Sequence, residues 1–560
     1  MKIIFCLMVF CLISFSNNYL FPKASTNDYT HKKMNLINNE NKFVNGEILL
    51  VLDPMCNFGN KVYDYNDFPG INCQTVEEIT TSRPIDNKES YKRILKLTLN
   101  EKNENATISA VEYLNSLDFV YSAEPNYYVR IENNEKIENI NDNDTSRSVN
   151  NSNYQWALES INMVDLDNYL SDYQHIISDS INCVGIMDSG VDYDFACYAE
   201  NQRHIDLKNR INTLGRSFSQ QFPISSTDEF NHGTPVAGII CAINNDIGID
   251  GICSKITLNS LKCYFSESHI MDGNVDISAL LTSLVNSLDY CTKPIEEQGL
   301  GIQISILNCS FGTYTNTSSF EAFFSNNSDI LFICGAGNSR KNIDIEKFYP
   351  ASYTFDNILT VGAIDSQDNM WVEENTGSGS NYGAESVDVF APGKNIISTS
   401  AKYHNNETNE DVINDYKQFS GTSFAAPHVT GLAALLKSIW IDYDEIDNIS
   451  DSSCCFNGEI SEIKNAILTL VRKVDGLEGK CLTGGVIDVE KAIETYLNQH
   501  HYSYEYYDIE RHRVYCEICQ YTAIEDHNWV IPNATTFGNY ESKAIISRLI
   551  CSKCGTMKII

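Results

Sequence analysis

The sequence predicts an α/β protein, with a doubly wound, mostly parallel sheet in the central part of the 560-residue chain. Between residues 153 and 497, short apolar runs alternate with helical stretches, which is the pattern of such a sheet. Several runs are apolar throughout, as expected for strands that helices cover on both faces. We also expect a small α+β unit before this domain and a small cysteine-rich module after it.

The N-terminus has the pattern of a secretory signal peptide, which we assign to residues 1–24. Lys2 precedes an apolar run over residues 3–15, which is short for a membrane span. Cleavage after Ser16 or Ala24 fits the small and polar residues that follow. No later run is long and apolar enough to span a bilayer. We therefore expect a mature chain without a membrane span, located outside the cell or in the lumen of the secretory pathway.

The charge balance excludes some classes of partner. The chain carries 40 basic and 74 acidic side chains, for a net charge of −34. Such a surface repels polyanions, so we expect neither nucleic acid nor an anionic membrane surface as a partner.

Cysteines and glycosylation motifs fit secretion only in part. Of the 19 cysteines, Cys6 and Cys11 lie in the signal peptide, so 17 remain and at least one has no partner within the chain or binds metal. Cysteines in or beside apolar runs are expected to be small core residues: Cys183, Cys309 and Cys334. Six Asn-x-Ser/Thr motifs are candidate glycan acceptors: Asn105, Asn143, Asn316, Asn406, Asn448 and Asn533. Asn308 heads a further motif that we expect to be buried.

Residues 41–130 predict the small α+β unit. Strands are expected over residues 43–52, 93–99 and 123–129, and a helix over 108–117, where apolar residues share one stripe. The following residues, 131–152, are rich in Asn, Asp and Ser, which predicts an exposed, acidic linker and a site of proteolysis.

In the central domain, we expect strands over residues 184–187, 256–261, 302–307, 330–333 and 358–361. Helices are expected over residues 277–288 and 429–436. In sheets of this kind the functional residues lie at the carboxyl ends of the strands.

Polar residues stand at these strand ends. Asp188 directly follows the first run, and Asn338 follows the run that ends at Cys334. His232 stands where a loop enters a helix, and Pro235 suits the first turn of that helix. Each motif alone also fits a turn or a structural residue.

A serine, Ser423, stands at the start of a helix of small residues, within the segment 421–428. Free backbone N–H groups and the positive end of the helix dipole lie at such a position and stabilise an oxyanion. A serine hydroxyl becomes a nucleophile only beside a base, and the base needs an orienting group. His232 and Asp188 supply groups of these two types.

The order Asp188, His232, Asn338, Ser423 is the order of the subtilisin type of triad. On these motifs the chain resembles the subtilisin-like serine proteases (subtilases, peptidase family S8) over residues 153–497 and into the N-terminal region. The segment Gly421–Pro427 is the most specific match. The resemblance implies an Asp188, His232, Ser423 triad with Asn338 in the oxyanion hole.

The resemblance also implies a substrate cleft and a propeptide. Two backbone segments would flank the side chain of the substrate residue before the scissile bond (P1): Ser310, Phe311 and Gly312, and Cys334, Gly335 and Ala336. Residues 41–130 are similar to the family's inhibitor-like propeptide, which is cleaved after folding, here within the linker. The mature domain would begin near Gln155.

The chain departs from the family pattern at three places. Pro235 stands where many members carry another histidine, at a position that is not catalytic. The loop between Asp194 and His204 is longer than in compact members. Ser339 stands where some members carry an acid that tunes specificity, so we do not expect a preference for basic P1 residues.

A calcium site is expected from the resemblance of residues 243–251 to the family's calcium loop. Its ligands would be the side chain of Asn245, the carbonyl oxygens of Ile243, Ile247 and Ile249, and the carboxylate of Asp206. Oxygen ligands of this kind suit a hard cation. The family's N-terminal ligand has no clear counterpart, and the alternative is a loop without metal.

The tail, residues 505–560, holds two Cys-x-x-Cys motifs made by Cys516, Cys519, Cys551 and Cys554. Their pairing is the pattern of a tetrahedral zinc ribbon, with His527 as a spare ligand. Disulfides are the alternative in a secreted chain.

Two functions are compatible with these patterns. The first is a secreted serine endopeptidase that acts on proteins or peptides, is made as a self-processing zymogen and is inhibited by its own propeptide. The second is a catalytically silent, subtilase-like binding protein that uses its cysteine-rich tail. The intact set of motifs favours the first.

Overall fold

The computed structural model describes about two thirds of the chain. The described residues are 43–54, 61–79, 91–130, 136–139, 155–163, 183–192, 204–212, 216–218, 228, 230–245, 248–267, 276–292, 300, 302–401, 403–405, 410–412, 415–438, 459–497, 502–506, 511–516, 522–526, 529–530, 548–551 and 557–559. The predicted signal peptide, most of the linker 131–152, and Cys519 and Cys554 lie outside them.

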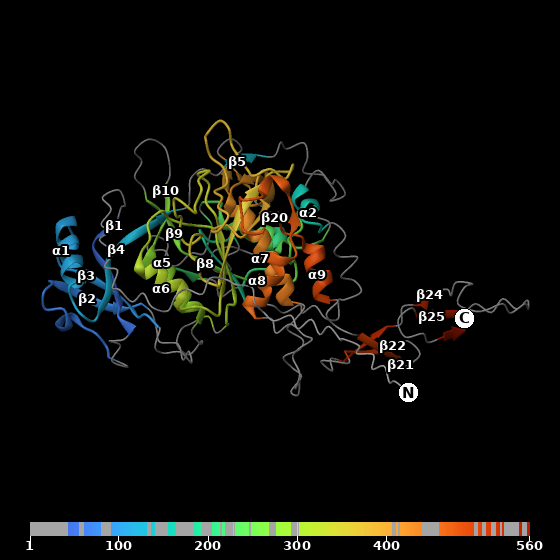
Figure 1. Cartoon of the computed structure of the whole chain (residues 1–560), viewed down its shortest axis with the longest axis horizontal. Coiled ribbons are helices and arrows are strands. Elements are labelled where there is room, and N and C mark those ends of the chain that lie inside the picture. The colour runs from blue at the N-terminus through green and yellow to red at the C-terminus, as the bar shows by residue number, and fades with distance from the viewer. Residues whose placement is uncertain are drawn as a thin grey trace, which may run out of the picture. The chain divides into compact units, whose positions relative to one another are not determined.

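A nine-stranded sheet in the order β19-β20-β14-β13-β12-β11-β6-β8-β7 forms the centre of the main domain (Figure 1). All its pairings are parallel except that of β19 with β20. This is the predicted fold class. The bounds are β6 Val184–Asp188, β7 Arg216–Ser217, β8 Leu258–Lys262, β11 Ile306–Cys309, β12 Leu331–Gly335, β13 Ile358–Ile364, β14 Val389–Pro392, β19 Arg472–Lys473 and β20 Gly485–Val486.

Helices of the main domain belong to two separate cores. One core contains residues of α4, α7, α8 and α9, and the other contains residues of α5 and α6, while strands of the sheet contribute to both. The sheet is therefore covered on both faces, which is why its strands are apolar throughout. The bounds are α2 Trp156–Ser160, α4 Gly233–Cys241, α5 Leu281–Thr292, α6 Ser318–Ser325, α7 Thr422–Ser438, α8 Ile460–Thr469 and α9 Val489–Leu497.

The strand predictions are confirmed, with shifted ends, but one helix prediction is partly wrong. Residues 277–280 of the predicted helix 277–288 lie in strand β10 (Asp276–Leu280), and only its remaining residues, in α5, are helical. The strand pairs with β9 (Tyr264–Glu267) on one side and with β4 (Val120–Arg130) on the other. Pairing on both sides satisfies its backbone groups, and this overrides the helical spacing of its side chains.

The small unit near the N-terminus contains β1 (Phe43–Leu52), β2 (Cys73–Glu78), β3 (Ile94–Leu99), α1 (Glu104–Leu114) and β4. Its sheet has the order β2-β3-β1-β4 and continues into β10 and β9 of the main domain. The helix packs on β1 and β4 around a core of its own. This unit is the α+β unit that the sequence predicts.

The predicted linker contains one described strand, β5 (Lys136–Asn139). It pairs antiparallel with β18 (Asp415–Ser420), which in turn pairs with β15 (Ile396–Ser400). Ser420 of β18 lies opposite Lys136. A hairpin of β16 (Tyr403–Asn405) and β17 (Glu410–Val412) lies between β15 and β18 in the sequence.

The tail forms two small antiparallel sheets, β21-β22-β23 and β24-β25-β26. Cys516 is the last residue of β22, and Cys551 is the last residue of β25. None of the helices in the described part of the chain has the length and hydropathy that a bilayer crossing needs. The bounds are β21 Tyr502–Tyr506, β22 Arg511–Cys516, β23 Thr522–Asp526, β24 Trp529–Val530, β25 Arg548–Cys551 and β26 Met557–Ile559.

The cysteines expected in the core of the main domain are free thiols: Cys183, Cys309 and Cys334. Cys309 and Cys334 are fully buried, whereas Cys183 is half-buried. Asn308 is fully buried too, as expected. Burial raises the pKa of the Cys309 thiol, which keeps it protonated and unreactive.

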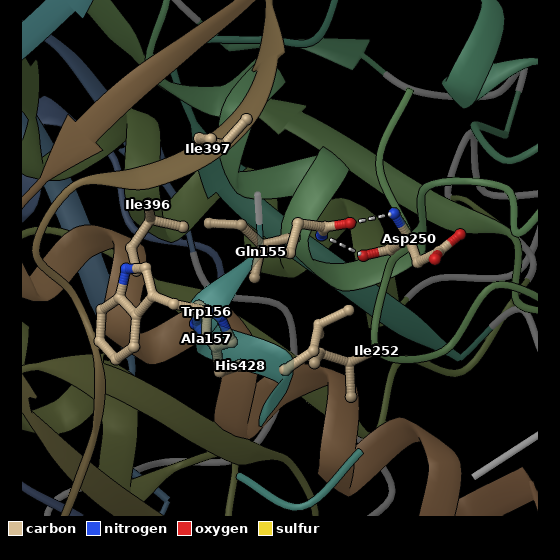
Figure 2. A pocket seen from close by; sticks show the side chains of 10 residues that line it. Gln155, Trp156, Ala157, Asp250, Ile252, Ile396, Ile397 and His428 are labelled. Atoms are coloured by element: carbon tan, nitrogen blue, oxygen red, sulfur yellow. Dashed lines mark hydrogen bonds between the residues drawn. The ribbon is translucent and has the colours of Figure 1, made fainter. Parts of the chain in front are cut away.

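Helix α7 passes through the first core and has a histidine inside it. His428 is only 2% exposed, and its Nδ1 lies 2.9 Å from the carbonyl oxygen of Phe424. The ring borders a small pocket beside Gln155, whose side-chain amide makes two hydrogen bonds to the backbone of Asp250, of 2.9 and 3.0 Å (Figure 2). Burial lowers the pKa of His428 to about 4, so the ring is neutral in the folded protein.

We expect His428 to make the folded state sensitive to acid. Its pKa is about 4 in the folded state and about 6.5 in an unfolded chain, so the unfolded state binds more protons between these values. The free energy of unfolding should fall by up to about 3 kcal/mol as the pH falls from about 6.5 to 4. Denaturant unfolding at several pH values, on Ser423→Ala protein to avoid self-digestion, measures this.

The matched variant is His428→Gln, which should lose stability at neutral pH but lack this part of the pH dependence. If the difference in unfolding free energy between the two proteins does not change between pH 7 and pH 4, the prediction is wrong.

Candidate active site

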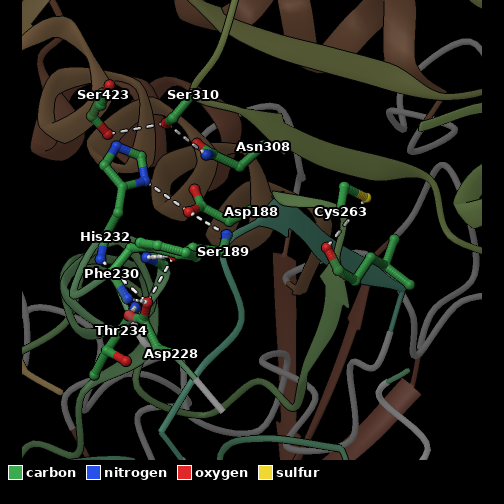
Figure 3. A network of polar contacts seen from close by, with 12 residues as sticks. Asp188, Ser189, Asp228, Phe230, His232, Thr234, Cys263, Asn308, Ser310 and Ser423 are labelled. Carbon is green, nitrogen blue, oxygen red and sulfur yellow. Dashed lines mark hydrogen bonds and ion pairs between the residues drawn. The ribbon is translucent and has the colours of Figure 1, made fainter. Parts of the chain in front are cut away.

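The central contact of the site joins Asp188 and His232. Asp188 is the last residue of β6, and His232 immediately precedes α4. The Asp188 Oδ1 atom lies 2.6 Å from His232 Nδ1, and both residues are nearly fully buried (Figure 3). Strand β6 has β8 on one side and β11 on the other, so Asp188 lies where the strand order reverses. Ligand sites in sheets of this type are expected at that point.

A second buried acid, Asp228, holds the two sides of this contact together. Its Oδ1 accepts a 2.7 Å hydrogen bond from Ser189 Oγ, and its Oδ2 accepts a 2.8 Å bond from the backbone N–H of Thr234. Ser189 follows Asp188 and Thr234 lies in the first turn of α4, so the carboxylate of Asp228 links the strand end to the helix start (Figure 3).

Glycine allows the backbones to approach each other here. A Cβ atom at Gly233 would lie 2.1 Å from the carbonyl oxygen of Gly190, so only glycine fits. The N–H of Gly233 donates a 3.0 Å hydrogen bond to Ser189 Oγ. The Gly that follows His232 is therefore required by close packing against the segment that follows Asp188.

Ser423 is the second residue of α7 and is 5% exposed. Its carbonyl oxygen accepts a 3.0 Å hydrogen bond from Ser310 Oγ, at the end of β11. The ring of the next residue, Phe424, lies 5.6 Å from the ring of His232. The start of α7 is thus placed beside the imidazole, which Figure 3 shows between Asp188 and Ser423.

Asn338 is fixed by the residue that precedes Ser423. Its Oδ1 accepts hydrogen bonds from the backbone N–H of Thr422, at 2.8 Å, and from Thr422 Oγ1, at 2.9 Å. Thr422 Oγ1 also accepts a 3.0 Å bond from the N–H of Gly337. These hydrogen bonds hold the oxygen of the Asn338 carboxamide toward Thr422. They therefore also fix the orientation of its NH2 group, which donates hydrogen bonds.

The two segments expected to flank the P1 side chain follow neighbouring strands. Ser310–Gly312 follow β11, whereas Cys334 and Gly335 end β12 and Ala336 follows it, and β12 pairs in parallel with β11. The ring of Phe311 lies 5.9 Å from that of Tyr264, in the core, so Phe311 offers the cleft its backbone and not its ring. Cys334 is fully buried and offers its backbone as well.

Sequence reasoning missed several residues that hold this site: Ser189, Asp228, Thr422 and Asn381. Asn381 Nδ2 donates to the carbonyl oxygen of Ala336 at 2.9 Å, and its Oδ1 accepts from the N–H of Lys341 at 2.8 Å. These residues lie in loops or at the start of a helix, where no periodic pattern marks them. Asp228 had one available signal, because it is an acid four residues before His232.

The expected calcium ligand Asp206 has the features of a cation ligand. It is fully buried, and its Oδ2 accepts 2.9 Å hydrogen bonds from the N–H of Ile249 and from Tyr416 Oη. Its Oδ1 is buried without a hydrogen-bond partner among the described residues. Burial, together with the nearby charge of Asp250, raises the pKa of Asp206 to about 6. Such an oxygen fits a hard cation.

The other expected metal ligands are only partly described. Ile243, Asn245 and Ile249 lie in the described loop around Asp206, whereas Ile247 lies outside the described residues. The described residues hold no cluster of three or more His, Cys, Asp or Glu side chains that could bind a metal. Nothing is described of the side chains of Cys516 and Cys551, and Cys519 and Cys554 lie outside the description.

The site contains the functional groups that acyl transfer needs. A carboxylate orients an imidazole, the start of a helix places a hydroxyl beside that imidazole, and an amide is fixed by the residue that precedes the serine. This is the arrangement in which a base activates a serine and N–H donors stabilise an oxyanion.

Comparisons with known proteins agree with this geometry. The model of the subtilase family (peptidase S8) matches residues 181–453, a range that contains all four site residues. The chain is 28% identical to "Subtilisin-like protease 2" of Plasmodium falciparum (isolate 3D7) over 329 residues, 56% of this chain and 20% of that protein. It is 33% identical to "Thermostable alkaline protease" of Halalkalibacterium halodurans over 232 residues, 41% of this chain and 53% of that protein.

The match to a third relative covers a larger share of that protein. The chain is 29% identical to "Subtilisin DY" of Bacillus licheniformis over 258 residues, 46% of this chain and 76% of that protein. Thus the chain spans only a fifth of the Plasmodium relative and about half of the alkaline protease.

Among solved structures, fervidolysin from Fervidobacterium pennivorans, a keratinolytic enzyme related to subtilisin, is similar with a TM-score of 0.53. The likeness covers 81% of this chain and 61% of that one at 17% sequence identity, so it supports the fold alone. From the matched family model, the subtilisin-like relatives and the shared fold, this chain contains a domain of the subtilase family, peptidase S8.

Proposed function

We propose that this protein is a secreted serine endopeptidase that hydrolyses peptide bonds in proteins or peptides. The observation that carries the proposal is the buried 2.6 Å contact between Asp188 and His232, with the start of α7 and Ser423 placed beside the imidazole. A contact of this kind has a clear use in catalysis, because it fixes the tautomer of the histidine.

Each residue of the site has a defined role in the proposed reaction. Ser423 Oγ attacks the carbonyl carbon of the scissile bond while His232 takes the hydroxyl proton, and His232 later gives this proton to the leaving amine. Asp188 stabilises the imidazolium that forms. The Asn338 amide and the N–H of Ser423 donate to the oxyanion, and losing one such donor typically costs about 3 kcal/mol in the barrier. Water then hydrolyses the acyl-enzyme.

We further propose that residues 41–130 are an inhibitory propeptide. Glu124 of β4 supports this, because its buried carboxylate reaches the start of α6 in the main domain. It accepts hydrogen bonds from the N–H groups of Ser318 and Ser319, each at 2.9 Å, and from the Ser319 hydroxyl. A carboxylate at a helix N-terminus satisfies free N–H groups and interacts favourably with the dipole.

Two strand pairings with the main domain support an inhibitory role. The end of β4 pairs with β10, with Arg130 opposite Ser278. The next described strand, β5, pairs with β18, with Lys136 opposite Ser420, three residues before Ser423. The chain therefore pairs with strands of the main domain up to Arg130 and again from Lys136. We propose that self-cleavage falls between Arg130 and Lys136, a narrower interval than the linker 131–152.

Self-processing tests the proposed activity. We expect the full chain to cleave itself between Arg130 and Lys136, and the resulting main domain to react with a serine-directed fluorophosphonate probe. Ser423→Ala should remain uncleaved and unlabelled, because it has no nucleophile. Gel electrophoresis, with mass spectrometry of the new N-terminus, measures both.

Matched variants separate activity from folding. Ser438→Ala changes a serine at the other end of α7 and should process normally. If folded protein neither cleaves itself nor takes the label, even after an added protease removes residues 41–130, the proposed activity is wrong. The alternative, a catalytically silent binding protein, would then be favoured.

The propeptide proposal makes a separate prediction at Glu124. We expect Glu124→Ala to release the propeptide sooner after cleavage, because the N–H groups at the start of α6 lose their acceptor. N-cap changes of this kind typically cost about 1 kcal/mol, which is roughly a fivefold weaker complex. The delay between cleavage on a gel and the rise in peptidase activity measures it.

The control is Glu112→Ala, an exposed acid on α1 that removes the same charge from the propeptide. An equal delay in the wild type and in both variants would contradict the role of Glu124.

We propose a structural calcium ion at Asp206, held also by Ile243, Asn245 and Ile249. The Asp206 Oδ1, which has no hydrogen-bond partner within the described part of the chain, supports this, because a bound cation would compensate for a buried carboxylate oxygen. When bound, the ion would stabilise the loop that follows α4 and take no part in the reaction.

Chelation tests this site. We expect removal of calcium with a chelator to lower the melting temperature of Ser423→Ala protein by several degrees. A ligand present at 100 times its Kd stabilises by about 2.7 kcal/mol. Asp206→Asn should melt at one temperature with or without calcium, and Asp475→Asn, an acid outside the loop, should respond like the parent. An equal calcium shift in Asp206→Asn and the parent would refute the assignment.

For the tail we retain both proposals, a zinc ribbon and disulfides. Cys516 and Cys551 each end a strand and are each followed three residues later in the sequence by a second cysteine, a pattern that supports a zinc ribbon. In either case the module would be structural or serve in docking.

A further inference from the structure

A phenylalanine ring, Phe348, lies against both segments that flank the expected P1 position. A Cβ atom built on Gly312 would lie 2.3 Å from Phe348 Cε1, and a Cβ atom on Gly337 would lie 3.0 Å from the same ring carbon. Gly312 ends the first segment, and Gly337 directly follows the second. The edge of one ring is therefore inserted between the two, where both lack a side chain.

The two segments on either side of the Phe348 ring both contact the start of α7, which carries Ser423. Ser310, in the first segment, donates to the carbonyl oxygen of Ser423. In the second segment, a Cβ atom on Gly335 would lie 3.1 Å from Thr422 Oγ1, and the N–H of Gly337 donates to that oxygen. The two segments thus converge on the first turn of α7, so a side chain bound between them belongs to the residue that Ser423 attacks.

The ring is held in place from several sides. The N–H of Phe348 donates to Ser352 Oγ at 3.1 Å, and its carbonyl oxygen accepts from the N–H of Ser352 at 2.7 Å. The next residue, Tyr349, exchanges two 2.8 Å backbone hydrogen bonds with Thr313, directly after Gly312. Phe348 is only 2% exposed, so moving its ring away would break packing and backbone contacts together.

A second aromatic ring narrows the same region. The ring of Tyr314 lies 4.9 Å from that of Phe348, and Tyr314 is 37% exposed, so it packs on the buried ring and also meets solvent. Its hydroxyl accepts a 3.3 Å hydrogen bond from Asn381 Nδ2, which also donates to the carbonyl oxygen of Ala336. Tyr314 is thus tied to the second segment.

We propose that Phe348 limits the P1 position to small side chains, so that this protein cleaves after residues such as alanine, serine or glycine. The inference rests on the proposed peptidase function and names its substrate class. A large P1 side chain would have to occupy the volume of a fixed aromatic ring, and overlap of that kind is resisted by a close-packed interior. A small side chain fits above the ring without displacing it.

The test compares P1 residues on the full chain after self-processing. Fluorogenic peptides that differ only at P1, alanine against phenylalanine, give kcat/KM for each. We expect the wild type to prefer alanine by at least tenfold. Phe348→Ala should raise kcat/KM for the phenylalanine peptide at least tenfold and leave that for the alanine peptide within a few fold, and Phe348→Leu should lie between.

The matched control is Phe323→Ala, which removes a ring of equal burial from α6, where the ring packs against Phe324 and Phe332. It should keep the wild-type P1 ratio, which separates a specific effect from general loosening. Fluorophosphonate labelling of each protein reports whether the nucleophile is competent.

The outcomes separate this inference from the function on which it rests. A labelled wild type that cleaves the phenylalanine peptide as fast as the alanine peptide overturns the role of Phe348 and leaves the peptidase function standing. A protein that is neither labelled nor active overturns both. If Phe348→Ala does not fold, the ratio of the wild-type kcat/KM values for the alanine and phenylalanine peptides decides by itself whether the inference holds.

Discussion

The buried contact between Asp188 and His232 sets the conditions that the surrounding structure must meet. A carboxylate and an imidazole that are excluded from water need hydrogen-bond partners, or their burial costs more than their contact returns. The second oxygen of Asp188, Oδ2, has no such partner among the described residues, so the contacts of Oδ1 must hold the group. The N–H of Ser189 supplies a 2.7 Å hydrogen bond to the same Asp188 oxygen that contacts His232. Asp228 then joins Ser189 to the first turn of α4, so the strand end and the helix cannot separate without breaking buried bonds.

Backbone N–H groups recur as the partners of buried acids in this molecule. Asp228 accepts from Thr234 at the start of α4, and Glu124 accepts from two residues at the start of α6. Both acids use helix starts, where N–H groups have no partner inside the helix. Asp206 differs, because one of its oxygens has a backbone donor while the other has no partner in the described structure. That asymmetry is the physical reason to place a cation at this acid and not at the other two.

Much of this arrangement was predictable from the sequence, because strong local patterns encode it. Apolar runs gave the strands of the sheet, and residues that follow such runs gave Asp188 and Asn338. The strand over residues 276–280 was missed, because its identity depends on pairing with β4 and β9, which no local spacing records. Asp228 and Thr422 were missed for a related reason: their roles come from contacts between loops and helix starts that lie far apart in the chain.

The reacting groups can therefore be recognised in this sequence from motifs, whereas the substrate specificity cannot. The reacting groups sit in motifs, since a nucleophile, a base and an oxyanion donor need defined residue types at strand and helix ends. The shape of the cleft depends on which side chain a distant segment inserts between two glycines, and Phe348 belongs to no such motif. The motifs place Gly312 beside the P1 position and Gly337 beside Asn338, but they do not show that the missing side chains of these glycines create the space that the ring fills. A substrate preference of this kind can only be inferred once the packing between the segments is known.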